Sequence, residues 1–549
     1  MKMKTKYIVP ALCAALALVS CNKFLDTSLD LNNTSETVAT SRSSIWSFAG
    51  AFYSPAFYGY SVVDGNLFAA ASDEAQQTLT SAQIVYFNNG ILNDSANPLW
   101  FLYTNFYEGI RAANYFLDYV ADGKGQALLE QNRNLITDAA NYQRDLRSLN
   151  WYIAEAHIAR AYYYSELIKM YGGVIIVEKA QNGVARSSYD ECVDYIVDEI
   201  DSWKGQLATN WEGNDSYTGR FTLGAALAIK ARKLLYAASP LHNPSGDWEK
   251  WNKAAEAAAD VIALGEYSLD PNYATYFVGS NTISSPETIW AVRRDVGNTL
   301  ERNNYPIATS GGASGVCPTQ NLVNAYEWTG TPDPNDPYAN RDPRLSATVV
   351  CNGSTWNSRT IAQGKGESDD MARTNASRTG YYLKKFLKDN LNLTQDAKEQ
   401  HNWIAFRYGE ILLNYAEAVN EAYGPSTVPA GFPMSASAAL KMVRDRASAS
   451  LPAVNVTTVE AFREAVKHER QVELAFEDHR YWDLLRWKDA MDVLNQPVQG
   501  VKITKTLSGY SYQTVDVASR TFNARNYYLP FLRSEIVNSA GSLQQNPGY

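Results

Sequence analysis

Residues 150–171, NWYIAEAHIARAYYYSELIKMY, are the stretch that decides the fold. Small Ala154 and Ala161 lie among bulky Ile158 and Tyr162 at helical spacings of three and four, a pattern that lets one helix pack closely against another. Gly172-Gly173 follows directly, as expected at the C-terminus of a helix. We therefore predict a packed helix that ends at Tyr171.

Similar periodic segments lie on both sides of this helix. They cover 98–120, 222–239, 249–264, 405–423, 435–448 and 458–477, and a Thr457-x-x-Glu460 capping box opens the last one. Ala and Tyr or Leu recur on a scale of roughly thirty residues, which is typical of tetratricopeptide-like helix pairs. The sequence predicts a mainly α-helical scaffold over about 98–265 and 400–490.

Between about 266 and 400 the chain is rich in Gly, Pro, Asn and Asp, with turns such as Asp333-Pro-Asn-Asp-Pro337. We expect loops with short strands there, and a second loop-rich segment over 50–98. Long irregular segments in a compact protein more often form binding surfaces than linkers. These two segments are therefore expected to form the ligand-binding lobe.

The first residues read as an export signal for a lipoprotein. Lys2, Lys4 and Lys6 precede an apolar run that is too short to span a bilayer, and Ser20-Cys21 follows. We predict a signal peptide over 1–20, lipidation of Cys21 and one domain over 21–549 that begins with a tether over 21–40. An ordinary secretory signal is the alternative interpretation.

The acidic balance disfavours polyanionic partners. The 549 residues carry a formal charge of -9, and loss of the three signal lysines makes it -9 - 3 = -12. Nucleic acids require a dense basic stripe, and no run of Lys and Arg supplies one. We expect no nucleic-acid partner.

Cysteine is sparse after the signal. Beyond Cys21, only Cys192, Cys317 and Cys351 are present. A disulfide between Cys317 and Cys351 and a set of buried inert thiols are both compatible with this usage.

Candidate catalytic and metal sites are weak. The five histidines form no His-Glu-x-x-His motif, so we predict neither a metal site nor a cofactor. Glu469 and Glu473 share a helix face, but Arg470, Arg480 and Arg486 follow closely, so ion pairing explains these acids better than glycosidase chemistry. The chain is not expected to be an enzyme.

The segment 467–490 resembles the signature helix of the SusD/RagB family of nutrient-binding outer-membrane lipoproteins. Further segments resemble the family in the same order along the chain: 161–173, 219–222 leading to 238–241, 340–345, 407–418, 528–536 and 545–549. Phe531-Leu532 departs from the Ile-Pro that is usual there. The resemblance implies four tetratricopeptide-like helix pairs, a loop-rich ligand face, and a lid on a SusC-like TonB-dependent transporter in the outer membrane, facing the cell exterior.

Candidate ligand contacts come from the loop-rich segments and their edges. Trp356 is the favoured aromatic platform, and the alternative interpretation is that it anchors its loop to the helical body. For Trp100, packing in the core is favoured over ligand binding. The candidates are Asn66, Asp73, Trp100, Arg293, Asn303, Asn304, Tyr305 and Trp356.

Two classes of function remain from the sequence. The first is a surface lipoprotein that binds oligosaccharide or polysaccharide and delivers it to the transporter. The second is a peptide-binding relative with the same partner, or a lipoprotein that only scaffolds the transporter. Aromatic loop residues without compensating charge favour neutral sugars.

Overall fold

The computed structural model describes residues 42–80, 82–178, 184–211 and 217–549. The predicted signal peptide (1–20), Cys21 and the tether (21–40) lie outside these residues. Of the helices in the described part of the chain, none has the length and apolar character needed to cross a bilayer.

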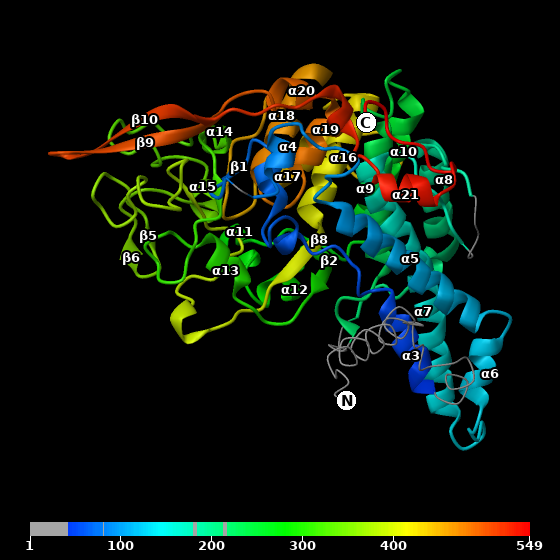
Figure 1. Ribbon diagram of the computed structural model, residues 1–549. Coiled ribbons are helices and arrows are strands. Elements are labelled where there is room, and N and C mark those ends of the chain that lie inside the picture. Colours follow the sequence, from blue (N-terminus) through cyan, green and yellow to red (C-terminus); the bar gives the residue numbers. More distant parts are fainter. Residues whose placement is uncertain (1–41, 81, 179–183, 212–216) are drawn as a thin grey trace, which may run out of the picture.

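A series of helices forms the scaffold: each of the first six packs on the next, and the last two both pack on the sixth (Figure 1). Its members are α5 (Trp100–Val120), α7 (Ala139–Tyr171), α8 (Tyr189–Trp203), α9 (Leu223–Ala238), α10 (Trp248–Ala263), α16 (Tyr408–Tyr423), α17 (Ala436–Arg444) and α18 (Val459–Glu473). Small buried residues such as Ala154 and Ala161 allow the close contacts. The predicted mainly α-helical, tetratricopeptide-like scaffold is confirmed.

Capping residues explain several of the helix ends. The side chain of Thr222 accepts a hydrogen bond from the backbone of Ala225 at the start of α9. Gly172 and Gly424 end α7 and α16 with φ of 73° and 85°, which glycine adopts without steric cost. The start of α18 differs from the prediction, because Thr458 rather than Thr457 is its N-cap.

Other boundaries also differ from the sequence prediction, since α17 and α18 end at Arg444 and Glu473 rather than at 448 and 477. Helix α7 begins at Ala139, well before residue 150. Residues 405–407 are not helical, because they belong to strand β8 (Asn402–Arg407), which pairs antiparallel with β2 (Thr288–Arg293). A partner strand distant in sequence thus overrides the local helical pattern.

The loop-rich segments form a lobe of short elements, seen on the left in Figure 1. Strand β1 (Ala75–Gln77) pairs with β3 (Val316–Pro318), which joins the two segments. The remaining pairs are β4 (Val349–Val350) with β7 (Tyr382–Leu383) and β5 (Thr355–Trp356) with β6 (Arg359–Thr360). The short helices are α11 (Tyr273–Tyr276), α12 (Asn281–Ser284), α13 (Thr299–Asn304), α14 (Gln320–Ala325) and α15 (Arg344–Thr348).

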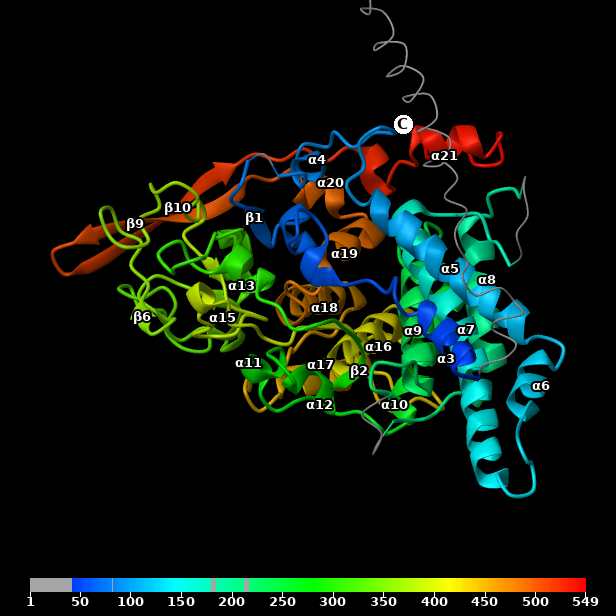
Figure 2. The same ribbon diagram turned by 60° about the horizontal axis from the view of Figure 1, so that its bottom comes forward.

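The sequence did not predict the long hairpin of β9 (Val498–Thr506) and β10 (Gly509–Ala518), which projects from the lobe (Figures 1 and 2). It follows α19 (Arg480–Trp487) and α20 (Ala490–Val493) and precedes α21 (Arg533–Asn538). At the other end of the molecule, α3 (Arg42–Ala51) packs on α5 and on α6 (Lys124–Glu130). The short α4 (Val85–Asn88) lies in the first loop-rich segment.

The cysteines in the described residues are thiols. Cys192, Cys317 and Cys351 are all buried and unbridged. Burial raises the pKa of Cys317 to about 11, so its reactive thiolate is scarce at neutral pH. The structure therefore favours inert thiols over the Cys317–Cys351 disulfide.

Candidate ligand-binding surface

Two of the predicted contact residues bind each other in the interior. Asn66 Nδ2 donates to Asn304 Oδ1 at 3.0 Å, and Asn304 Nδ2 donates back to Asn66 Oδ1 at 2.9 Å. Only 2% and 1% of these residues are exposed. Their role as surface ligand contacts is therefore corrected: they join the first loop-rich segment to helix α13.

Asp73 also has its carboxylate occupied. It accepts hydrogen bonds from Arg480 Nε and Nη2 at 2.8 and 2.9 Å. Although burial opposes ionisation, Arg480 holds the pKa of Asp73 below its usual value. This ion pair ties the first loop-rich segment to α19, and the role of Asp73 in ligand binding stays a prediction.

Tyr305 and Trp356 are packed inside the lobe. Their rings meet edge to face with centroids 6.2 Å apart, and the residues are 0% and 4% exposed. The Tyr305 hydroxyl donates to the backbone carbonyl of Lys388. Because stacking on a sugar needs an exposed ring face, the prediction that Trp356 is the platform is wrong for this structure, and Trp356 anchors its loop.

The other predicted contacts stay closer to solvent but do not form one site. Arg293 is exposed at the end of β2. Asn303 is half-buried and donates to the carbonyl of Gly65 at 2.7 Å. Trp100 is half-buried on the scaffold and stacks on Tyr103 at 4.2 Å. Their role in binding stays a prediction.

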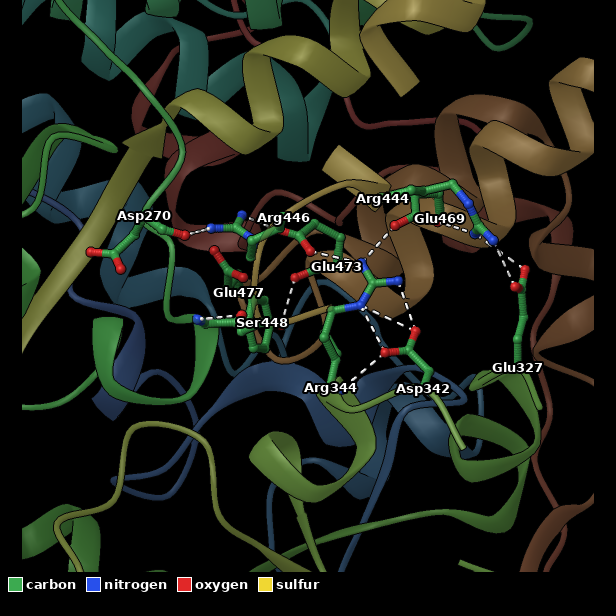
Figure 3. A network of polar contacts seen from close by, with 12 residues as sticks. Asp270, Glu327, Asp342, Arg344, Arg444, Arg446, Ser448, Glu469, Glu473 and Glu477 are labelled. Atoms are coloured by element: carbon green, nitrogen blue, oxygen red, sulfur yellow. Dashed lines mark hydrogen bonds and ion pairs between the residues drawn. The ribbon is translucent and has the colours of Figure 1, made fainter. Parts of the chain in front are cut away.

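The acids suspected of catalysis lie in a buried ion-pair network (Figure 3). Glu473 accepts hydrogen bonds from Arg344 and Arg407 at 2.8 Å and from Arg446 at 2.7 Å. Burial alone would raise the pKa of this carboxyl, but the three guanidinium groups hold it well below its usual range. Glu473 is therefore an ionised structural group.

The neighbouring carboxylates are also paired with basic side chains. Glu469 accepts hydrogen bonds from Arg344 at 2.6 Å and from Arg444 at 2.7 Å. The same network contains Asp342, Glu287, Glu327, Glu477 and Lys385. The ion pairing that the sequence favoured over catalysis is present, but the predicted partners were wrong. Glu469 and Glu473 pair with Arg344, Arg407, Arg444 and Arg446. Arg470, Arg480 and Arg486 pair with Asp483, Asp73 and Glu417 instead.

A hollow of about 370 Å³ opens in the loop-rich lobe. It lies between residues 335–338, residues 345–355 and strand β10. Tyr338 and Tyr512 contribute rings with centroids 5.5 Å apart at 80°. Both side chains are half-buried, so the hollow offers partly accessible aromatic edges and faces.

Polar groups surround these rings. Asn335 and Asp336 are exposed on the rim. Asn352 Nδ2 donates to the Tyr512 hydroxyl at 3.2 Å, and this contact fixes the ring. Lys384 Nζ donates to the carbonyl of Ser346 at 2.7 Å, and burial lowers the pKa of this lysine.

The chemistry of the hollow suits recognition. Aromatic surface with amide, carboxylate and ammonium groups can stack on and hydrogen-bond a polyhydroxylated ligand. Among its lining residues, all of which are described, Asp336 is the single carboxylate, whereas acid–base glycoside hydrolysis uses two. Within the described ranges, no group of His, Cys, Asp and Glu is arranged to hold a metal ion.

The same lobe presents an exposed tryptophan. Trp328 is 42% exposed, and the Arg341 guanidinium lies 4.4 Å from its ring centroid. Arg341 Nε donates to the carbonyl of Tyr326 at 2.9 Å, which holds the guanidinium in place. Trp328 therefore has the solvent exposure that was expected of Trp356.

The sequence reasoning missed Trp328, Tyr338 and Tyr512. The signal for the first two was an aromatic residue on each side of the 333–337 turn. The signal for the third was the alternating Tyr510-Ser-Tyr512 after Ser508-Gly509, which is typical of a hairpin.

Two family models match most of the sequence. One, described as SusD family, covers residues 286–549, and the other, described as starch-binding associating with outer membrane, covers 23–235. The chain belongs to the SusD/RagB family.

Relatives and solved structures agree with this membership. SusD-like protein P2 of Formosa agariphila is 22% identical over 77% of this chain and 79% of its own length. A SusD-like protein of Bacteroides ovatus is 22% identical over 98% of this chain and 97% of its own length. Both are relatives of this SusD/RagB chain along most of their length.

Solved structures share the fold. A SusD-like protein from Bacteroides fragilis has a TM-score of 0.76 at 24% identity, with 95% of this chain and 99% of that one covered. A SusD-like carbohydrate binding protein from the same species has a TM-score of 0.73 at 24% identity, with 92% of this chain and 99% of that one covered. Surface glycan-binding protein A from Bacteroides fluxus has a TM-score of 0.68 at 21% identity, with 93% of this chain and 100% of that one covered.

The segments that carry the SusD/RagB resemblance meet in the interior of the molecule. Glu469 and Glu473 from 467–490 pair with Arg344 from 340–345 (Figure 3). Arg407 from 407–418 joins the same network through Glu473. These segments therefore join the scaffold to the lobe, and of their residues only Leu345 lines the hollow.

Proposed function

We propose that this SusD/RagB protein is a cell-surface lipoprotein that captures a neutral oligosaccharide or polysaccharide and delivers it to a SusC-like TonB-dependent transporter. The observation that carries the proposal is the hollow of the loop-rich lobe, where Tyr338 and Tyr512 lie among hydrogen-bonding side chains. Membership in a SusD-like carbohydrate-binding family supports it. In this proposal residues 21–549 act as one domain, anchored to the outer membrane through Cys21.

Capture needs only moderate affinity. The apolar face of a sugar ring stacks on a tyrosine, while Asn335, Asp336 and Lys384 exchange hydrogen bonds with hydroxyl groups, directly or through water. A longer glycan chain would extend out of the hollow over the surface of the same lobe, where the ring of Trp328 is exposed.

Delivery follows from differential binding. A lid can close over its transporter on ligand binding only if the closed state makes contacts with the ligand that the open state lacks. A weakly bound glycan is also released readily once the transporter offers competing contacts. A peptide ligand for the same lid is the alternative that the binding experiment must exclude.

The test compares two tyrosines of strand β10 in the chain from residue 22 onward. Tyr512 lines the hollow, whereas Tyr510 is two residues away, also half-buried, and donates to Glu367 at 2.9 Å instead. In calorimetry against neutral glycans, we expect Tyr512→Ala to weaken binding about tenfold, the loss of roughly 1.4 kcal/mol of stacking and packing. Tyr510→Ala is the matched control and should bind as the wild type does.

Three outcomes count against the proposal. Equal affinity of the two variants would move the site out of the hollow. Binding of peptides and no glycan would replace the ligand class while leaving a transporter lid intact. Binding of neither would favour a protein that only scaffolds its transporter.

A further inference from the structure

Two tryptophans are exposed in the described part of the chain, one in the lobe and one on the scaffold. Trp328 is 42% exposed in the lobe, and Trp248 is 48% exposed at the start of α10. The indole nitrogen of Trp248 donates to the carbonyl of Ala422 at 2.9 Å. The indole nitrogen of Trp328 has no hydrogen-bond partner among the described residues. Trp328 therefore offers solvent both ring surface and a donor group.

The exposed Trp328 belongs to a loop that also borders the hollow. In the loop formed by residues 326–342, Trp328 and Arg341 face each other across the neck in an antiparallel bridge. The far part of the loop supplies three residues to the wall of the hollow: Asn335, Asp336 and Tyr338. One loop thus carries the exposed tryptophan and part of the hollow.

The two ends of this loop are fixed by the ion-pair network of Figure 3. Glu327 pairs with Arg444 at 2.7 Å, and Asp342 pairs with Arg344 at 2.8 Å. These residues lie directly before Trp328 and directly after Arg341 in the sequence. The network therefore holds the neck of the loop in place beside the hollow.

The Arg341 guanidinium connects the tryptophan to the wall of the hollow. It lies over the Trp328 ring, 4.4 Å from the ring centroid. Its Nη1 donates to the carbonyl of Pro337 at 3.4 Å, and Tyr338 follows directly. The centre of the indole is therefore within about 9 Å of the Pro337 carbonyl oxygen. The ring lies beside the hollow but does not line it.

We infer that Trp328 is a second sugar-binding subsite that acts together with the hollow, so that the ligand is a stretch of several linked sugars rather than a monosaccharide or disaccharide. The inference rests on the proposed glycan binding at the hollow. Arg341 supports one face of the indole and leaves the rest of the exposed ring to the sugar. Arg341 is a positioning residue in this arrangement.

Two subsites on one loop make affinity depend on chain length. A short oligosaccharide occupies the hollow alone, whereas a longer chain also stacks on the indole without a second loss of translational freedom. One aromatic contact contributes about a tenfold gain in affinity. We therefore expect affinity to rise with chain length until the chain reaches Trp328 and to stay constant for still longer chains.

The test is calorimetry with linear neutral oligosaccharides of defined length. The probes are maltooligosaccharides, cellooligosaccharides and xylooligosaccharides, each from the disaccharide to the octasaccharide. Trp328→Ala removes the ring, and Trp328→Phe keeps an aromatic face. Trp248→Ala is the matched control, because its indole is similarly exposed but lies on the scaffold. Both rings are exposed, so all three variants should melt close to the wild type.

We expect the wild type and Trp248→Ala to bind the octasaccharide of the recognised series about tenfold more tightly than the disaccharide. Trp328→Ala should bind the two lengths with nearly equal affinity, and Trp328→Phe should recover most of the gain. The same gain with length in Trp328→Ala as in the wild type would overturn the inference. So would an equal loss of affinity at every length, because the ring would then act on the hollow itself.

Failure of the proposed function gives a different pattern. If the wild type binds no oligosaccharide, or if Tyr512→Ala binds every length as the wild type does, the hollow is not the glycan site, and this inference fails with the proposed function. If Tyr512→Ala weakens binding at every length while Trp328→Ala changes none, the proposed function stands and the second subsite alone is refuted.

Discussion

Glu473→Gln tests whether the ion-pair network holds the lobe to the scaffold. The substitution keeps the shape of the side chain but removes the charge shared by Arg344, Arg407 and Arg446. Removing one partner from a buried ion pair costs about 3–5 kcal/mol, because the opposite charge stays buried. Each arginine keeps another acid, such as Glu287 for Arg407 and Arg446, so we expect about 3 kcal/mol.

Urea unfolding followed by tryptophan fluorescence measures this loss. The matched control is Glu464→Gln on the same helix, whose side chain is 71% exposed and lies 3.3 Å from Lys467. Exposed pairs contribute little, so the control should change the free energy of unfolding by less than about 0.5 kcal/mol. If both variants unfold at the same urea concentration, the reasoning is refuted.

The loss of stability in Glu473→Gln should also depend on pH. The arginines lower the folded-state pKa of Glu473 below the unfolded value of about 4.3. Its contribution to stability is therefore complete above pH 4.3 and is lost as the pH falls through the folded pKa. The deficit of Glu473→Gln should be largest at pH 7 and shrink in strong acid. Since Glu473 does not line the hollow, folded variant protein should keep its glycan affinity.

Two further predictions concern other buried residues. Burial raises the pKa of Glu74 to about 8, above the unfolded value of about 4.3, so the stability of the protein should fall as the pH rises between these values. Glu74→Gln should therefore melt at a higher temperature than the wild type at pH 7.5 and at the same temperature near pH 4. A difference in melting temperature that does not depend on pH would contradict this. Trp356→Ala should lower the free energy of unfolding by about 3–5 kcal/mol through the cavity it leaves. Unchanged glycan affinity in calorimetry on folded Trp356→Ala would confirm that this ring is an anchor, and lost affinity with intact stability would contradict it.

Local patterns were sufficient for most of the scaffold. The run from Ala154 to Tyr171 carries its own helical periodicity and its own glycine stop, so α7 could be predicted without neighbours. Helix α8 was missed, although Ser188 and Glu191 form the capping box that marks its start. Its signal was present in the sequence and was not used.

The candidate site shows the opposite case. Asn66, Asn304 and Tyr305 have the residue types of a glycan site, but a polar side chain becomes a ligand contact only if the fold leaves it accessible. Contacts between segments far apart in sequence decide this, and composition does not reveal them. The buried pair of Asn66 and Asn304 joins residues 238 positions apart.

The sequence by itself determined the helical scaffold, the loop-rich character of the lobe and the family, because helix periodicity, caps and turn residues act over a few neighbouring positions. Only the tertiary structure decided which aromatic rings face solvent: it buried Trp356 and left Trp328 exposed. It also decided that β8 is a strand, since its partner β2 is distant in sequence. Burial and strand pairing are properties of the whole packed chain, so no local stretch could specify them.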